Sequence, residues 1–335
     1  FISFEKENKT SNFEEIPSNL EFVFRNNSTK KKVPPDNINQ TKLILEIPNN
    51  LMFAGKKISK KQELISYLKE NLKVLTDVKY EINNNTIVLP RGEHKILKDL
   101  IIPDNYGLLI NPGAKLYLAP NVNILLKGGP IKINGTATEP VIIDSLVPER
   151  NWGTISVLSS KETSIITHSK IINGGSNVKS IVQGVYFTGQ LNFFHSDVNI
   201  LHSFIGNTKA EDALNIKKSK FNIHKVEFAY NKYDAFDGDW VKGKISNSFI
   251  HQNGNDGLDF SGSKVVIRDT IFTKMQDKSL SIGEQSKVDI VNCRFADSNY
   301  AIAVKDLSNV RILASSIFNN NIGIAVYRKK PVFGS

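Results

Sequence analysis

Six short segments that begin 22 residues apart decide the fold: DALNIKK (212–218), DAFDGDW (234–240), DGLDFSG (256–262), KSLSIGE (278–284), YAIAVKD (300–306) and IGIAVYR (322–328). The third residue of each segment is large and apolar, and the second is small. A pair of apolar residues, five apart, also recurs between the segments at steps of 22 or 23: Ile200 and Ile205, Ile223 and Phe228, Ile245 and Ile250, Ile267 and Phe272, Ile290 and Phe295, and Ile312 and Ile317.

A repeat of this length is too short for two helices, and its alternating apolar residues fit three short strands joined by turns. One coil cannot bury its own apolar face, whereas stacked coils bury it and pair each strand in parallel with its neighbours. The spacing therefore predicts an all-β solenoid, a parallel β-helix of about 22-residue coils, from about residue 77 to 330. A one-residue excess between Lys278 and Ile290 is expected in a turn or bulge near Gly283, Glu284 and Gln285.

Two earlier segments carry a family resemblance. GPIKINGTATEPVIIDS (129–145) and NWGTISVL (151–158), together with the repeats, resemble the right-handed parallel β-helix superfamily with the pectate-lyase-like fold, which includes bacterial β-helix-repeat proteins. The resemblance implies a right-handed coil. It implies no single activity, because this superfamily includes lyases, hydrolases, epimerases, tailspikes and adhesins.

Residues 1–76 lack the repeat and are predicted to form a small α+β module or a cap. Ser59–Lys73 fits an amphipathic helix with Ser59 as its N-cap and Gln62 completing a capping box, and residues 20–25 and 42–47 fit strands. A cap is the simpler interpretation, because an open solenoid end is an aggregation-prone edge. The β-helix itself is assigned to residues 77–335.

Composition narrows the class of partner. The 335 residues include 43 basic and 33 acidic side chains, for a formal net charge of +10, which favours a polyanion. Aromatic residues are not interleaved with arginine as in nucleic-acid-binding modules, so an acidic polysaccharide is preferred to nucleic acid. No apolar run approaches the roughly 18 residues of a membrane span. The single cysteine, Cys293, excludes an internal disulfide and a cysteine-rich zinc site.

The first residue bears on the location of the protein. Residue 1 is phenylalanine rather than methionine. We therefore expect a processed or trimmed N-terminus and a secreted, periplasmic or cell-surface protein.

Strand parity predicts an acidic face on the solenoid. Leu214, Ile216 and their equivalents should point inward, which leaves residues 213 and 215 and their equivalents outward. These outward residues are small apart from Asp237 and Asp259, so they would leave a shallow trough for a linear polymer. The two aspartates would lie about 4.8 Å apart, the strand spacing. Their charges would repel by roughly 3 kcal/mol at an effective dielectric of about 20, so a cation, a lysine or a shared proton is expected.

A second column lies just ahead of these strands. It consists of Asp212, Asp234 and Asp256 and continues as Lys278 and Tyr300. A structural role is the simpler interpretation for Asp212, because an aspartate at a bend commonly accepts backbone N–H bonds. A functional role is favoured for Asp234 and Asp256, which lie beside other carboxylates.

These columns define the candidate site. The catalytic candidates are Asp237, Asp259, Lys278 and Lys305. The substrate-binding candidates are Asn215, Asp234, Asp239, Trp240, Asp256 and Glu284. The candidate metal ligands, with Ca²⁺ as the ion, are Asp234, Asp237, Asp256 and Asp259.

Two chemistries and one alternative fit this site. Carboxylate pairs serve as acid and base in glycoside hydrolysis. The resemblance to β-helix lyases implies instead that Ca²⁺ neutralises a uronate carboxylate while Lys278 or Lys305 removes the neighbouring proton, as a lyase or C5-epimerase would require. The chain lacks the His-Gly motif of polygalacturonases and the Asp-Pro-His-Asp motif of alginate epimerases. A non-catalytic adhesin or structural spacer that binds glycan therefore stays open.

Overall fold

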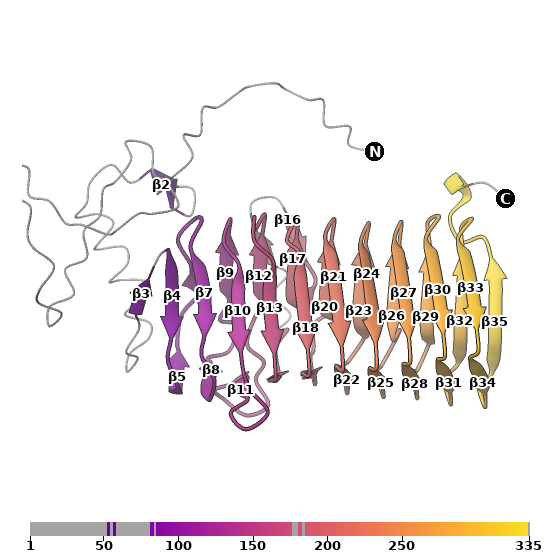
Figure 1. Cartoon of the computed structure of the whole chain (residues 1–335), viewed down its shortest axis with the longest axis horizontal. Coiled ribbons are helices and arrows are strands. Elements are labelled where there is room, and N and C mark those ends of the chain that lie inside the picture. The colour runs from indigo at the N-terminus through magenta and orange to yellow at the C-terminus, as the bar shows by residue number, and fades with distance from the viewer. Residues whose placement is uncertain are drawn as a thin grey trace, which may run out of the picture.

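The chain folds into the predicted solenoid of stacked coils (Figure 1). The computed structural model describes residues 52–53, 56–57, 81–83, 85–175, 180–182 and 185–333. The predicted helix at 59–73 and the predicted strands at 20–25 and 42–47 lie outside these residues, as does most of the proposed cap. Upstream of the solenoid, β1 (Met52–Phe53) and β2 (Lys56–Lys57) form an antiparallel pair. No helix in these ranges is long and apolar enough to cross a membrane.

Each coil contributes one strand to each of three sheets, here called sheets 1, 2 and 3 in chain order. Sheet 1 contains β3 (Glu81–Asn83), β4 (Thr86–Leu89), β7 (Gly107–Ile110), β10 (Ile131–Asn134), β13 (Ser164–Thr167), β18 (Val198–Leu201), β21 (Lys220–His224), β24 (Lys242–Ser246), β27 (Lys264–Arg268), β30 (Lys287–Val291) and β33 (Asn309–Leu313). Sheet 2 contains β5 (Gly92–Ile96), β8 (Ala114–Leu118), β11 (Val141–Ser145), β14 (Ser169–Ile172), β19 (Phe204–Gly206), β22 (Glu227–Ala229), β25 (Phe249–His251), β28 (Ile271–Thr273), β31 (Arg294–Ala296) and β34 (Ser316–Phe318). Sheet 3 contains β6 (Leu100–Ile101), β9 (Ile124–Lys127), β12 (Ile155–Leu158), β17 (Gly189–Phe194), β20 (Asp212–Lys217), β23 (Asp234–Asp239), β26 (Leu258–Ser261), β29 (Lys278–Gly283), β32 (Tyr300–Lys305) and β35 (Ile322–Tyr327).

Pairing within the three sheets is parallel, except that β3 runs antiparallel to β4. The connection from β14 to β17 holds an antiparallel hairpin of β15 (Ser180–Val182) and β16 (Val185–Phe187). A 3₁₀ turn, η1 (Pro331–Phe333), follows the last strand.

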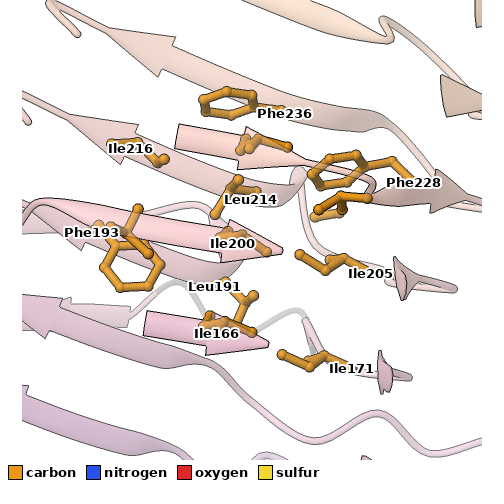
Figure 2. Close-up of a cluster of buried hydrophobic side chains, with 14 of the residues drawn as sticks. Ile166, Ile171, Leu191, Phe193, Ile200, Ile205, Leu214, Ile216, Phe228 and Phe236 are labelled. Atoms are coloured by element: carbon orange, nitrogen blue, oxygen red, sulfur yellow. The ribbon is translucent and has the colours of Figure 1, made fainter. Parts of the chain in front are cut away.

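The third residues of the repeated segments and the recurring apolar pairs meet in one core (Figure 2). The third residues of the repeated segments line the inside of sheet 3, and the recurring pairs line the insides of sheets 1 and 2. Leu214, Ile223 and Phe228 show the pattern in one coil, since each is fully buried. Burial of this apolar area is the main force that holds the coils together, at roughly 25 cal/mol per Å².

Turns repeat as regularly as strands. The residue that follows each middle or late strand of sheet 2 has a left-handed backbone, as at Asn207 (φ 51°) and Tyr230 (φ 60°). In the turn after β29, both Glu284 (φ 55°) and Gln285 (φ 60°) are left-handed, whereas the preceding coil has only Gly262 at this turn. The predicted position of the extra residue is therefore confirmed.

The predicted outward direction of the second repeat position is wrong. Ala213, Ala235 and Ala301 belong to the core and are fully buried, and Ser279 is also buried. The strand ladder explains this, because it pairs Asp212 with Asp234 and Leu214 with Phe236 but skips the residue between them. The chain turns the corner from sheet 2 to sheet 3 at this residue, so two consecutive side chains face inward.

Candidate functional site

The outer face of sheet 3 gathers the predicted residues in three columns. The central column consists of Asn215, Asp237, Asp259 and Ser281, which pair in register on β20, β23, β26 and β29. The predicted adjacency of Asp237 and Asp259 is thus confirmed. Asn215 Nδ2 donates to Asp237 Oδ2 at 2.8 Å, so the column is hydrogen-bonded at its N-terminal end.

The opening column consists of Asp212, Asp234, Asp256 and Lys278, at the start of the same strands. Asp234 Oδ1 accepts the Asp256 backbone N–H at 2.8 Å, and Asp256 Oδ1 accepts the Lys278 backbone N–H at 3.0 Å. The backbone-accepting role that was predicted for Asp212 is therefore found at Asp234 and Asp256. Asp212 Oδ2 instead accepts from two side chains, Thr188 Oγ1 at 2.5 Å and Asn215 Nδ2 at 2.9 Å.

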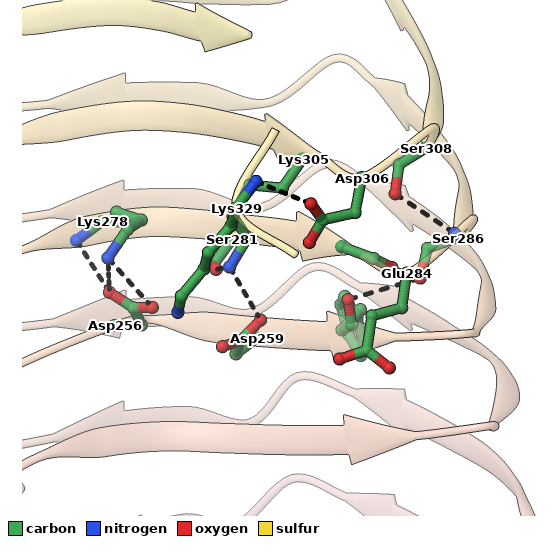
Figure 3. A network of polar contacts seen from close by, with 12 residues as sticks. Asp256, Asp259, Lys278, Ser281, Glu284, Ser286, Lys305, Asp306, Ser308 and Lys329 are labelled. Atoms are coloured by element: carbon green, nitrogen blue, oxygen red, sulfur yellow. Dashed lines mark hydrogen bonds and ion pairs between the residues drawn. The ribbon is translucent and has the colours of Figure 1, made fainter. Parts of the chain in front are cut away.

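The closing column contains two lysines that approach the carboxylates from the ends of their strands. Lys217 Nζ lies 3.4 Å from Asp239 Oδ2. The Lys305 side chain is only 6% exposed, and its Nζ donates to Ser281 Oγ at 2.6 Å and lies 3.8 Å from Asp259 Oδ1 (Figure 3). Asp259 Oδ1 is buried and receives no hydrogen bond from the described residues.

Three carboxylates are close enough to share one ion. One oxygen each from Asp234, Asp256 and Asp259 lies within 4.8 Å of the others. Oxygen donors are the ligands that Ca²⁺ prefers, and Asp259 Oδ1 lacks a hydrogen bond, so this donor set fits a hard cation. Asp237, predicted as a fourth ligand, is not in this group.

Burial dominates the electrostatics of the site. It raises the pKa of Asp212 and of Asp234 to about 7, with the Asp256 carboxylate adding to the effect at Asp234. Burial, reinforced by the charges of Asp212, Asp239 and Asp259, holds the pKa of Asp237 well above its usual range. Burial therefore favours the protonated form of Asp237.

Lys278 does not have the lowered pKa expected of a lysine that acts as a base. Burial alone would lower its pKa, but the carboxylates of Asp256 and Asp277 outweigh burial and raise the pKa above the ordinary lysine value. Its Nζ lies 3.2 Å from Asp256 Oδ1 and also contacts Asp277 Oδ2 (Figure 3). This environment keeps Lys278 as a fixed positive charge and argues against proton abstraction by it.

The raised carboxyl pKa values predict a stability that falls as pH rises. Asp212 and Asp234 bind more protons in the folded than in the unfolded chain between about pH 4 and 7, so the free energy of unfolding decreases through this window and stays low above it. We expect the melting temperature to be lower at pH 8 than at pH 5.5. Thermal melts across pH, monitored by circular dichroism, measure this.

Asp237→Asn is the variant that tests the same effect at one residue. Asparagine carries no charge and its amide oxygen can still accept from Asn215, so the variant should gain stability at pH 8 and little at pH 4, where the unfolded aspartate is also partly protonated. An equal change at both pH values would contradict the pKa assignment.

The remaining predicted residues lie at the edge of the site. Glu284 forms an ion pair with Lys330, and neighbouring Asp306 accepts the backbone N–H of Lys330 at 2.7 Å, so both carboxylates hold the C-terminal segment. Trp240 is 56% exposed, and a Cβ at Gly262 of the next coil would lie 2.7 Å from its ring. The indole therefore lies over a glycine and outside the core, and Lys218 Nζ lies 5.9 Å from the centroid of its ring.

Sequence reasoning missed three contacts in this region. Thr188 and Asp277 lie in turns outside the six repeated segments, so the 22-residue pattern carried no signal for them. Histidines that are far apart in sequence also meet, since the rings of His168 and His202 stack with centroids 4.7 Å apart. Their equal position in successive coils was the available signal.

The comparisons with known proteins agree with the fold. Residues 183–332 match the family model described as the right-handed beta helix region. The crystal structure of the Dettilon tailspike protein matches with a TM-score of 0.50 and 13% identity, over 71% of this chain and 52% of the tailspike. The chain thus spans about half the length of that structure, and the likeness concerns the fold alone.

Two further solved structures resemble the chain more weakly. The A-module of the Azotobacter vinelandii mannuronan C-5 epimerase matches with a TM-score of 0.34 and 10% identity, over 73% of this chain and 91% of the module. The Streptococcus pneumoniae surface protein and adhesin PfbA matches with a TM-score of 0.27 and 9% identity, over 83% of this chain and 98% of its own. The comparison with curated proteins found no match.

Proposed function

We propose that this chain, a right-handed parallel β-helix protein, binds an acidic polysaccharide along the outer face of sheet 3 and acts on its uronate units as a lyase or C5-epimerase. The observation that carries the proposal is the contact of buried Lys305 with Asp259, beside Asp237, a carboxyl group whose protonated form burial favours. A base, an acid and a fixed positive charge at Lys278 thereby lie on one face built from neighbouring coils.

The chemistry needs these three groups in separate roles. Removal of the C5 proton leaves negative charge that spreads into the uronate carboxylate, and the Lys278 ammonium is suited to stabilise this charge. We assign proton removal to Lys305, because the carboxylates beside Lys278 raise the pKa of Lys278 above the ordinary lysine value. In elimination the C4–O4 bond breaks as the C4–C5 double bond forms, and the Asp237 carboxyl can supply the proton that the leaving oxygen needs. In epimerisation the proton returns to C5 from the opposite face.

A divalent cation fits the same site. Asp234, Asp256 and Asp259 would hold it, and Ca²⁺ would neutralise the uronate carboxylate when bound. We assign the ion to this triad rather than to Asp237, whose Oδ2 accepts the Asn215 hydrogen bond. Because the polymeric substrate is extracellular, we also propose that the protein acts outside the cytoplasm.

A non-catalytic glycan-binding adhesin or spacer is the second candidate. The observation in its favour is that Asp212, Asp234, Asp237, Asp239 and Asp256 all have partners within the columns. A ladder that satisfies its own carboxylates holds coils together and requires no reaction.

A single experiment separates these functions. The protein is incubated in D₂O with polygalacturonate, alginate or a glycosaminoglycan, with Ca²⁺ or with a chelator. The near-ultraviolet absorbance of an unsaturated uronate and deuterium at C5 are followed together, and binding to the same polymers is measured by sedimentation. We expect one of these two signals with the matching polymer, and a lower rate in chelator.

Each outcome has one meaning. A rising absorbance shows a lyase, because its product has a C4–C5 double bond and no hydrogen at C5. Deuterium at C5 without a rising absorbance shows an epimerase. Binding without either signal supports the adhesin or spacer. No binding to any of the uronate polymers would overturn the proposal of an acidic polysaccharide as the ligand.

A further inference from the structure

A cavity of about 630 Å³ lies away from the acidic columns, beside the turns that lead from sheet 2 to sheet 3. Its wall comes from four successive coils, because Ser145 ends β11 and residues Asn173, Asn207 and Tyr230 directly follow β14, β19 and β22. Its volume is within the range of small-molecule sites in proteins. The cavity has no part in the proposed reaction, and the inference drawn from it does not rest on that reaction.

Tyr230 is the unusual residue in this wall. Its backbone is left-handed (φ 60°), at the position where the two preceding coils place Asn173 (φ 61°) and Asn207 (φ 51°). Asparagine tolerates this conformation well, whereas a bulky aromatic residue there is strained. The column continues with Gln252 (φ 52°) and Lys274 (φ 61°), so the turn itself imposes this backbone conformation. Tyr230 differs from these equivalents because it places an aromatic side chain at the turn, and that side chain is 52% exposed.

The Tyr230 ring is held in a fixed orientation. It makes an edge contact with the His251 ring, with centroids 5.4 Å apart and an interplanar angle of 83°. His251 is itself buried, and its Nε2 lies 3.0 Å from Glu227 Oε1. One aromatic face beside the cavity is thus supported from behind by a buried hydrogen-bonded pair.

The rest of the wall is polar and balanced in charge. Asn173 Nδ2 donates to Asp144 Oδ1 at 2.6 Å, and Asn207 bonds in turn to Asn173, which gives a fixed row of amides. Two acidic residues are offset by two lysines: Asp144, Glu149, Lys209 and Lys232. Amides beside one supported aromatic ring suit the hydroxyl groups and the apolar face of a sugar, and the balanced charge gives no preference for a polyanion.

We propose that this cavity binds a neutral oligosaccharide, with Tyr230 stacking on a sugar ring and the row of Asn173 and Asn207 bonding its hydroxyls. The site would lie at the corner between sheets 2 and 3, would include none of the residues of the acidic columns, and would take a different class of glycan.

The test uses a variant whose melting temperature should rise while its affinity for a neutral oligosaccharide falls. Tyr230→Asn places the residue that its own column favours at this backbone position. We expect the melting temperature to rise by about 2–4 °C. Binding of a neutral trisaccharide should weaken by about tenfold or more, the equivalent of one lost stacking contact.

The probes are maltotriose, cellotriose and triacetylchitotriose, with trigalacturonate as the acidic comparison, and binding to the full chain is followed by saturation-transfer NMR. Lys274→Asn is the matched control, because Lys274 is exposed, lies outside the cavity wall and has the same left-handed backbone (φ 61°) at the equivalent turn two coils further on. At least one neutral probe should bind to the parent and to Lys274→Asn, and lose affinity in Tyr230→Asn. Absence of binding by all three neutral probes, preferential binding of trigalacturonate, or a Tyr230→Asn variant that melts earlier would each overturn the assignment.

Discussion

Replacing Lys305 with methionine is expected to slow the proposed reaction on a uronate polymer by about 10²- to 10⁴-fold, the usual contribution of a positioned acid or base. Methionine preserves the length of the side chain in a site where Lys305 is only 6% exposed, but it cannot accept a proton. The rate of absorbance increase measures the loss for a lyase, and deuterium incorporation at C5 measures it for an epimerase. Sedimentation with the same polymer should show that binding persists.

Lys264→Met is the matched control for this variant. It removes the same charge from an exposed lysine on β27, in sheet 1, so that the net charge of the two variants is equal. The control should keep full activity. If both variants lost activity equally, overall charge would be the cause, and if neither lost it, Lys305 would not be the base.

Replacing Phe236 with alanine is expected to lower the free energy of unfolding by about 3–5 kcal/mol, through lost burial and the cavity left behind. Phe236 is fully buried in β23, and its ring makes edge contacts with Phe221 and Phe260 at centroid distances of 5.1 and 5.4 Å. Three coils therefore lose packing from one substitution. Urea unfolding followed by circular dichroism provides the measurement.

The same repeat position in the last coil provides the control. Ile324 lies in β35 and is 49% exposed, because no following coil covers it in the described structure. Ile324→Ala should cost about 1 kcal/mol or less. Equal losses in the two variants would show that stacking between coils does not determine the stability of the solenoid.

The sequence determined the fold well because its period is strict. A spacing of 22 residues placed Asp237 beside Asp259 and fixed the extra residue at Glu284 and Gln285, both of which the structure confirms. The direction of Ala213 could not be obtained in this way. Simple alternation assumes an unbroken strand, and here the strand ladder skips one residue at the corner.

The sequence predicted which residues lie together at the candidate site better than it predicted their charges and pKa values. Lys305 reaches Asp259 across two coils, as a column of equivalent positions implies. The raised pKa of Lys278 comes first from Asp256, in the opening column, and then from Asp277, a turn residue that the column pattern did not indicate. The cavity beside Tyr230 was missed for a similar reason, because its wall includes a longer turn, residues 146–154, that breaks the repeat.

Two features of the solenoid have an evolutionary consequence: the strand ladder skips one residue at the corner, and every coil adds one strand to each sheet. Each coil adds one strand to every sheet, and neighbouring strands are about 4.8 Å apart. Duplication of one 22-residue unit within the gene would therefore shift all later coils along the axis by that spacing. The contacts inside each coil would not change. The outer face of sheet 3 would then lengthen by whole increments of one strand spacing, while the acidic columns stayed in the coils that already hold them.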